Sequence, residues 1–261
     1  MALSPINAII KALIIDLHHL EDNYIIMLFK LLILSTILSA CSHSFDVSTS
    51  KGLLKKAKYL SKSGQYIEAS KELENIINSN ASYNIRASAQ LEIAEISFKK
   101  EEFLQAEAEY TQGLQIFSKS KLSEKFQYKK ALSIYKQLPS KYQRDLSVAP
   151  NAILQFQRFI ISYPKSTFAK VSKKYIEKIK VLLLKKELYI ANFYFTQKKF
   201  KASSKRFQKI SKKNITAPIL FKTTVSTYKA GYPGWTYYYK KLVRLFPKSS
   251  EVVRIKPLLS L

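Results

Sequence analysis

Histidine, cysteine and aspartate are scarce in this sequence, and their scarcity excludes most catalytic sites. The 261 residues include three histidines and one cysteine. Removal of a leader ahead of Cys41 would leave His43 as the only histidine and Asp46 and Asp145 as the only aspartates. Ser-His-Asp triads, Cys-His pairs and zinc sites cannot be assembled from these residues. No Gly-rich phosphate loop occurs, and nothing marks a glycosidase-type glutamate pair. We therefore expect no enzyme, no metal and no cofactor.

Glycine and proline are also few, at 5 and 8 residues. The stretches between them are rich in Lys, Leu, Ile, Ala and Glu, which favours helices over many short strands. Because 47% of the residues are hydrophobic, the chain can bury a sizeable core. The composition predicts an all-α fold.

Acidic residues are outnumbered, with 18 Asp and Glu against 44 Lys and Arg, for a formal net charge of +26. A field of this sign attracts anionic lipid, lipopolysaccharide or nucleic acid. AT-rich coding also enriches lysine, so a solvated basic surface without a dedicated polyanion site is the alternative explanation.

An export signal leads up to Cys41. Residues 27–30 form a charged start, residues 31–37 a short apolar run, and residues 38–41 read Leu-Ser-Ala-Cys. This order is typical of a secretory signal, and the run is too short to span a bilayer as a helix. The last four residues resemble the lipobox of bacterial lipoproteins, which implies cleavage before Cys41, a covalent diacylglycerol and an N-acyl chain such as palmitate. An uncleaved anchor and a buried helix of a cytosolic protein are the alternatives.

The signal divides the chain into four expected regions. Residues 1–26 are an upstream extension outside the natural protein, 27–40 the signal peptide, 41–50 a lipidated linker and 51–261 the folded domain. Each buried methylene of an acyl chain contributes about 0.8 kcal/mol, so several chains anchor stably. Ser42, in place of Asp, resembles the enterobacterial sorting signal for the outer membrane. We expect a lipid-anchored protein on the periplasmic face of that membrane.

A repeated pattern runs through residues 51–261, in which an aromatic residue is followed by a small residue and then a large apolar one. Small residues also occur twelve positions earlier, at Ala57, Ala94 and Ala191. Two helices pack closely when each offers a small side chain where they cross. Pro164 and Pro247 follow two of the copies and end helices. The full copies are Tyr66-Ala69-Leu73, Phe103-Ala106-Tyr110 and Phe200-Ser203-Phe207, with Ser in place of Ala in the last. Ala152-Phe156 is a partial copy in which Ala149 replaces the aromatic residue, and Tyr232-Trp235-Tyr239 is a divergent copy.

This is the pattern of tetratricopeptide repeats, and it predicts a right-handed helical solenoid of about five helix pairs. An ordinary helical bundle is the alternative. Stacked pairs expose a concave groove that suits an extended peptide. Lys51, Lys58, Glu95 and Phe98 fall off the packing stripe of the first helices, so they are candidate groove residues. Plain solvated surface is the alternative for each of them.

The lipobox and the repeats together resemble the BamD family, the lipoproteins of the outer-membrane barrel-assembly machinery, also described as competence lipoproteins. The resemblance extends over the whole chain after Cys41. It rests on Arg144-Asp145, on residues 149–152, on the Tyr-Pro-Lys-Ser of residues 163–166 and on residues 188–194. The first two repeats lack the family's closing proline, so the carboxy-terminal half resembles the family better.

The resemblance implies a non-catalytic scaffold that helps to fold and insert outer-membrane proteins. The implied partners are a BamA-like barrel-bearing protein with periplasmic domains, other assembly lipoproteins and unfolded outer-membrane proteins, and nucleic acid is not among them. The implied partner contacts are Tyr142, Arg144, Asp145 and Arg158. The alternative for Arg144 and Asp145 is that they pair only with each other. The alternative function is a generic envelope lipoprotein that binds a polyanion, such as peptidoglycan or DNA, or division and envelope-constriction proteins.

Overall fold

The computed structural model describes residues 27–28 and 45–259, so Cys41 and most of the expected signal peptide lie outside the described residues. The chain divides into two compact units, Met1–Gly52 and Leu53–Leu261. In the first unit, Thr49 Oγ1 accepts a hydrogen bond from the backbone N–H of Gly52 at 3.1 Å. Thr49 therefore caps the start of helix α2 (Ser50–Lys62), because its side chain satisfies an otherwise unpaired N–H.

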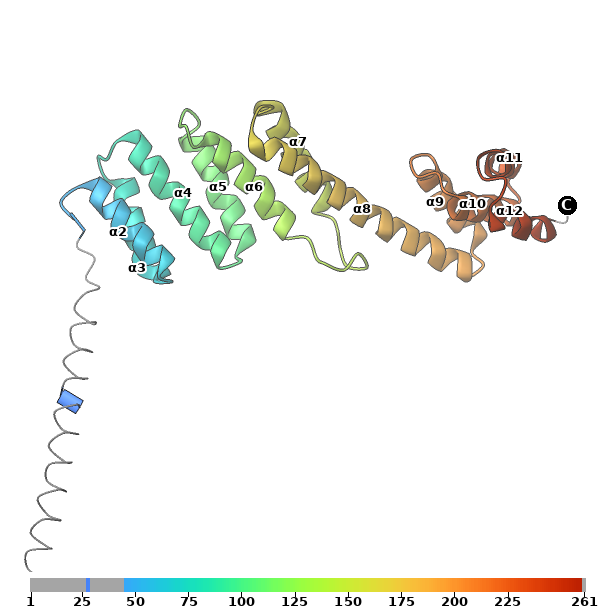
Figure 1. Cartoon of the computed structure of the whole chain (residues 1–261), viewed down its shortest axis with the longest axis horizontal. Helices are drawn as coiled ribbons and strands as arrows, with labels where there is room; N and C mark the ends of the chain where they lie inside the picture. The colour runs from blue at the N-terminus through green and yellow to red at the C-terminus, as the bar shows by residue number, and fades with distance from the viewer. Residues whose placement is uncertain (1–26, 29–44, 260–261) are drawn as a thin grey trace, which may run out of the picture. The chain divides into compact units, whose positions relative to one another are not determined.

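The second unit is built from helices joined by short connections, and no strand occurs among residues 45–259 (Figure 1). This confirms the all-α prediction. The elements that follow α2 are α3 (Tyr66–Asn78), α4 (Tyr83–Lys99), α5 (Phe103–Ile116), α6 (Ser123–Lys136), α7 (Ala149–Ser162), α8 (Thr167–Thr196), α9 (Phe200–Ser211), α10 (Ala217–Lys229), α11 (Trp235–Leu245), α12 (Ser250–Ile255) and the 3-10 turn η1 (Lys256–Leu258).

Helices pack mainly against their neighbours in the chain, from α3 with α4 through to α10 with α11. The core is accordingly split into clusters that follow one another along the chain. They join α2, α3 and α4, then α4, α5 and α6, then α6, α7 and α8, then α8, α9 and α10, and finally α10, α11 and α12. Helices α2 to α11 thus form five successive pairs, which is the tetratricopeptide-type solenoid that the sequence predicts.

The predicted small residues lie where the two helices of a pair meet. Ala57 and Ala69 belong to one core cluster, Ala94 and Ala106 to the next, and all four are fully buried. In the fourth pair Ser203 Oγ of α9 donates a hydrogen bond to the backbone carbonyl of Ala191 in α8 at 3.2 Å. A side chain of one helix reaches the backbone of another only when the two approach closely, so the packing role of these positions is confirmed.

The structure corrects the register of the last copy of the pattern. In each pair the second helix begins at the first residue of the pattern, and the large residue seven positions later is fully buried. Helix α11 begins at Trp235, and the buried residue seven positions on is Leu242. Tyr232 lies in the preceding turn and is exposed. The divergent copy is therefore Trp235-Tyr238-Leu242, because the turn before α11 is longer than the turns inside the first, second and fourth pairs.

The turns inside three pairs contain a residue with left-handed backbone two positions before the second helix. Gly64 holds this position before α3 with φ of 80°, Glu101 before α5 with 61°, and Lys198 before α9 with 56°. A residue with a Cβ pays about 1–2 kcal/mol in this conformation. The turns of the second and fourth pairs are therefore conformationally strained, whereas glycine adopts the same backbone in the first pair without strain.

Candidate functional site

Helix α8 has 30 residues, far longer than its neighbours, and its length creates the site. Ser166 Oγ accepts a hydrogen bond from the N–H of Phe168 at 3.0 Å and caps the helix. No glycine or proline occurs between residues 167 and 196, so nothing ends the helix before Lys198 turns the chain. At about 1.5 Å per residue the helix is about 45 Å long, roughly twice what one neighbouring helix can cover.

Helices α7 and α9 pack on different parts of α8. The α7 cluster uses Ala169, Ile176 and Ile179 of α8, whereas the α9 cluster uses Ala191. Between them lies the apolar run Val181–Leu184, whose first side chain is 52% exposed. Four consecutive apolar residues on a helix point to every side, so neighbouring helices cannot bury them all.

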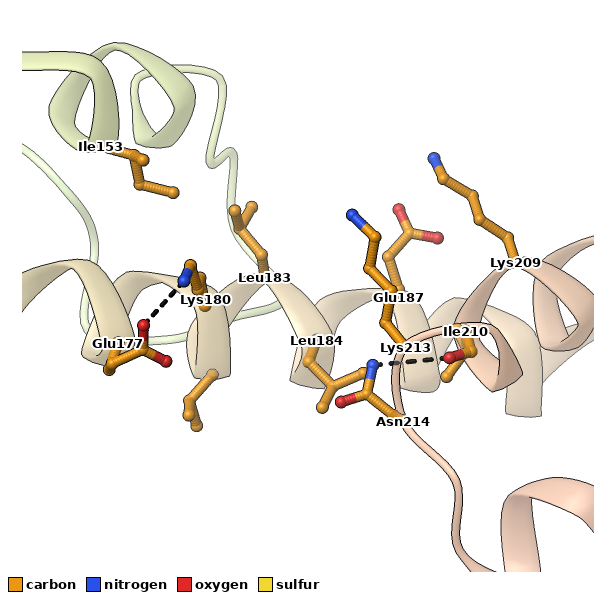
Figure 2. A pocket seen from close by; sticks show the side chains of 11 residues that line it. Ile153, Glu177, Lys180, Leu183, Leu184, Glu187, Lys209, Ile210, Lys213 and Asn214 are labelled. Atoms are coloured by element: carbon orange, nitrogen blue, oxygen red, sulfur yellow. Dashed lines mark hydrogen bonds and ion pairs between the residues drawn. The ribbon is translucent and has the colours of Figure 1, made fainter. Parts of the chain in front are cut away.

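A cavity of about 750 Å³ occupies the space between α7, the middle of α8 and the end of α9 (Figure 2). Its apolar surface comes from Ile153 of α7, from α8 and from Ile210 of α9. The lining residues are Ile153, Glu177, Lys180, Val181, Leu183, Leu184, Glu187, Lys209, Ile210, Lys213 and Asn214. We call this the mid-α8 cavity.

The rim of the mid-α8 cavity has unbalanced positive charge. Its two carboxylates are already paired, since Glu177 lies 2.7 Å from Lys180 Nζ and Glu187 lies 3.2 Å from the Arg206 guanidinium. The other two lysines of the rim, at positions 209 and 213, are exposed and make no ion pair within the described residues. A ligand with apolar and acidic groups would complement this surface.

The loop between α6 and α7 holds three of the expected partner contacts and lies against the carboxy-terminal half of α8. The Tyr142 ring meets the Tyr189 ring edge-on at 5.9 Å, and Lys186 Nζ donates to the backbone carbonyl of Arg144 at 2.9 Å. The Arg144 guanidinium makes no hydrogen bond or ion pair within residues 45–259. The loop is therefore held through its backbone and its tyrosine, which leaves this guanidinium available.

Asp145 binds Ser147 rather than Arg144, so the suggestion that Arg144 and Asp145 merely pair with each other is wrong. One carboxylate oxygen accepts from the Ser147 backbone N–H at 3.1 Å and the other from the Ser147 hydroxyl at 2.6 Å. These two hydrogen bonds, with a smaller contribution from Lys186, hold the pKa of the Asp145 carboxyl below its ordinary value. Its local role is to shape the entry to α7.

Arg158, the fourth expected contact, is exposed on α7 between the exposed apolar side chains Leu154 and Ile161. No hydrogen bond or ion pair within the described residues joins it to the α6–α7 loop. None of the four expected contacts lines the mid-α8 cavity. Three of the expected contacts thus share the α6–α7 loop, whereas Arg158 lies on helix α7.

Of the expected groove residues, two are exposed and two are engaged in contacts between helices. Lys58 is exposed on α2, and Lys51 is exposed within the first unit. Glu95 is only 14% exposed and lies 3.3 Å from Lys125 Nζ and 2.8 Å from Lys129 Nζ. Phe98 packs into the core with Lys129 Nζ 4.6 Å from its ring centre. The interpretation of Glu95 and Phe98 as residues off the packing stripe is wrong, because they join α4 to α6.

Sequence reasoning missed the mid-α8 cavity. The signal that could have found it is the apolar run at residues 181–184 inside a lysine-rich stretch without glycine or proline. Among the described residues, no helix is both long and apolar enough to cross a membrane, and no group of His, Cys, Asp or Glu is arranged to hold a metal ion.

Residues 47–230 match the protein family YfiO, described as outer membrane lipoprotein. The chain belongs to this family. The match runs from just before α2 to the end of α10, so it includes the mid-α8 cavity and the α6–α7 loop. Membership of the YfiO family confirms the resemblance to BamD lipoproteins and assigns the chain to the outer membrane.

Comparisons with other proteins add little to the YfiO assignment. No curated protein matches the chain. Among solved structures, YrrB, a TPR protein with an unusual peptide-binding site, aligns at 13% identity and a TM-score of 0.33, covering 81% of this chain and 94% of its own. A thermophilic TPR protein of Thermus thermophilus aligns at 14% identity and a TM-score of 0.35, covering 82% of this chain and 100% of its own.

Proposed function

We propose that this chain is a non-catalytic scaffold of the outer-membrane β-barrel assembly complex, which helps to fold and insert outer-membrane proteins. The observation that carries the proposal is the mid-α8 cavity in a member of an outer membrane lipoprotein family. Exposed apolar side chains such as Val181 favour a bound partner, because contiguous apolar surface is rarely left in water. The proposed occupant is a periplasmic domain of a barrel-bearing, BamA-like partner.

The α6–α7 loop supplies a second contact in this proposal. Arg144 presents a guanidinium without a partner in the described chain, and such a group binds a carboxylate through two parallel hydrogen bonds. The Tyr142–Tyr189 contact holds the loop against α8. Other assembly lipoproteins and unfolded outer-membrane proteins are the further proposed partners, with Lys58 as a candidate client contact.

The proposed anchor is a diacylglycerol and an N-acyl chain on Cys41, which hold the protein on the periplasmic face of the outer membrane. Metabolic labelling with palmitate tests it. Wild type should incorporate label and Cys41→Ala should not. Equal labelling of the two would contradict the anchor without affecting the proposed partner.

The partner is tested by mass spectrometry of proteins that co-purify with a carboxy-terminally tagged chain from detergent-extracted outer membranes. Val181→Asp places a charge in the mid-α8 cavity and should remove the barrel protein. Val171→Asp is the matched control, because Val171 is also an exposed valine of α8 but lies outside the cavity. Arg144→Glu tests the loop separately.

The outcomes separate the claims. Loss of the barrel protein with Val181→Asp, and not with Val171→Asp, supports the cavity as the partner site. Loss with Arg144→Glu alone would move the site to the α6–α7 loop. If wild type captures no barrel protein, the assembly function is wrong.

One observation favours the alternative function, a lipoprotein that binds a polyanion such as peptidoglycan or DNA. Residues 165–261 carry 24 lysines and arginines but only three glutamates, so most of the excess charge lies in this part of the chain. Binding through phosphates or carboxylates releases counterions and therefore weakens steeply with salt. A fluorescent oligonucleotide titrated at increasing salt tests this function. Weak binding that varies little with salt would exclude it.

A further inference from the structure

A second cavity, of about 520 Å³, lies in the carboxy-terminal repeat, away from the mid-α8 cavity. It is formed by α9, α10, α11 and the turn before α11. Besides Gly234, its lining residues are Lys205, Gln208, Thr227, Tyr232, Tyr237 and Tyr238. We call it the tyrosine pocket.

Hydrogen bonds join the polar groups behind the tyrosine pocket. The hydroxyls of Ser204 and Thr227 lie 2.9 Å apart, and both are fully buried. Gln208 Nε2 donates to Ser204 Oγ at 2.9 Å and to Thr227 Oγ1 at 3.4 Å. The amide nitrogen of Gln208 is therefore held within the protein, whereas its amide oxygen makes no hydrogen bond within the described residues and can accept one from a ligand.

Exposed tyrosine rings form the rest of the pocket. Tyr237 is 61% exposed and Tyr232 is 41% exposed, and the rings of Tyr237 and Tyr238 meet edge-on at 5.1 Å. Burial raises the pKa of Tyr238 above its ordinary value. Three large rings gathered at a surface are a typical protein-binding feature, because each buries much apolar area with little loss of side-chain freedom.

Positively charged donors, but no carboxylate acceptor, lie at this pocket. Lys205 is exposed at its edge with no ion pair among the described residues, and Lys241 Nζ lies 5.6 Å from the Tyr237 ring centre. No carboxylate lines the pocket, and Glu251 is the only acidic residue of the sequence between positions 188 and 261. A ligand rich in hydrogen-bond acceptors and without positive charge therefore suits the pocket.

We propose that the tyrosine pocket binds a proline-rich segment in the polyproline II conformation. Proline has no backbone N–H, and this helix leaves its carbonyls without internal partners, so they can accept from Lys205 and from the tyrosine hydroxyls. The pyrrolidine rings pack against the tyrosine rings, as in other aromatic-lined grooves for such segments. An ordinary peptide brings N–H groups, and a glycan brings hydroxyl hydrogens, for which the pocket offers only neutral oxygens, those of Gln208 and the tyrosine hydroxyls.

Trp235 provides a direct readout, because it is the only tryptophan of the chain and follows Gly234 of the pocket. The full-length chain in detergent is titrated with acetylated, amidated decaproline, and tryptophan emission is followed. We expect a saturable change for wild type and no change with a glycine-serine peptide of equal length. Tyr237→Ala should weaken binding by about tenfold or more, as expected for a central aromatic contact.

Two further variants keep the test decisive. Phe193→Ala removes an exposed aromatic ring of α8 outside the pocket and should bind like wild type. Tyr237→Phe keeps the ring and removes only the hydroxyl, so it reports on donation if Tyr237→Ala fails to fold by circular dichroism. Three results would overturn the proposal. The first is no saturable change at millimolar decaproline, and the second is wild-type affinity in both Tyr237 variants when both are folded. The third is tighter binding of chitohexaose than of decaproline.

Discussion

Gly113 of α5 lies where the ring of Phe126 from α6 leaves no room for a side chain. A Cβ at this position would lie 2.3 Å from Phe126 Cε1, and Phe126 is itself fully buried. We expect Gly113→Ala to lower the free energy of unfolding by about 1–3 kcal/mol through overpacking, although alanine favours a helix by about 1 kcal/mol. Urea denaturation followed by circular dichroism measures it.

Gly234→Ala is the control for this substitution. A Cβ there meets no atom within 4 Å, and its φ of −72° suits any residue. It should leave stability within about 1 kcal/mol of wild type. Equal stability of the two variants would mean that Phe126 moves aside without cost.

Glu109 of α5 is a partly buried carboxylate with an incomplete set of hydrogen bonds. Gln105 Nε2 donates to one oxygen at 2.9 Å, while the other oxygen is buried without a partner. Burial raises the pKa of Glu109 above its ordinary value of 4.5. The folded chain therefore binds this proton more tightly than the unfolded chain, so ionisation destabilises the fold at neutral pH.

Glu109→Gln should consequently be more stable than wild type at neutral pH, and the difference should shrink as the pH falls below 4.5, where wild type is protonated in both states. Thermal unfolding at several pH values measures this. Glu74→Gln, at an exposed position of α3, is the control and should show no such trend. A pH-independent difference for Glu109→Gln would show that packing rather than charge is responsible.

At the scale of elements, the turn between α8 and α9 stores strain at one residue. Lys198 has a φ of 56°, whereas the next residue, Lys199, has a φ of −79°. Lys198→Gly should raise the free energy of unfolding by about 1 kcal/mol, because glycine adopts the left-handed region without penalty. Lys199→Gly should lower it, since there glycine only adds freedom to the unfolded chain. Thermal midpoints that move in the same direction for both variants would contradict this account.

Helix pairing could be predicted from the sequence because it depends on local patterns. Small residues twelve positions apart and the aromatic residue that opens each second helix reflect contacts within one pair. The length of α8 could not be predicted in this way. The repeat pattern marks only Ala191 on this helix, and that position does not indicate that the helix begins as early as Thr167. The mid-α8 cavity follows from that continuity and was missed with it.

Contacts between successive pairs were harder to predict than contacts within a pair. Glu95 looks like a surface residue in sequence because its partners Lys125 and Lys129 lie about thirty residues away, on α6. The same holds for Tyr142, whose ring contact with Tyr189 joins a loop to a distant helix. The predicted register of the pattern in α11 was wrong for another reason, because the turn before Trp235 is longer than in the first, second and fourth pairs.

At the scale of the whole molecule, some features of the chain lie beyond the residues that define its family. The family match ends at residue 230, whereas the basic excess continues through α11 and α12. The tyrosine pocket uses Tyr232 and Tyr237, which lie beyond the match. Features outside residues 47–230 are thus the place to look for properties specific to this chain.

The 30-residue α8 also governs how the repeats unfold. Helices α7 and α9 pack on α8 rather than on each other within the described chain. Leu183→Pro, in the middle of α8, should break the helix at a cost of about 3 kcal/mol or more. Calorimetry should then resolve two transitions where wild type shows one, and Val171→Ala, with the helix intact, should keep one. A single transition for Leu183→Pro would mean that other contacts transmit the coupling.

In a repeat protein each unit contacts only its neighbours, so cooperative unfolding extends as far as the interfaces between units are unbroken. Helix α8 packs on α7 of the third pair and on α9 of its own pair, so one continuous helix takes part in both contacts. A ligand in the mid-α8 cavity would stabilise both pairs in the same binding event. Ligand binding should therefore slow amide hydrogen exchange in α7 and in α9 together.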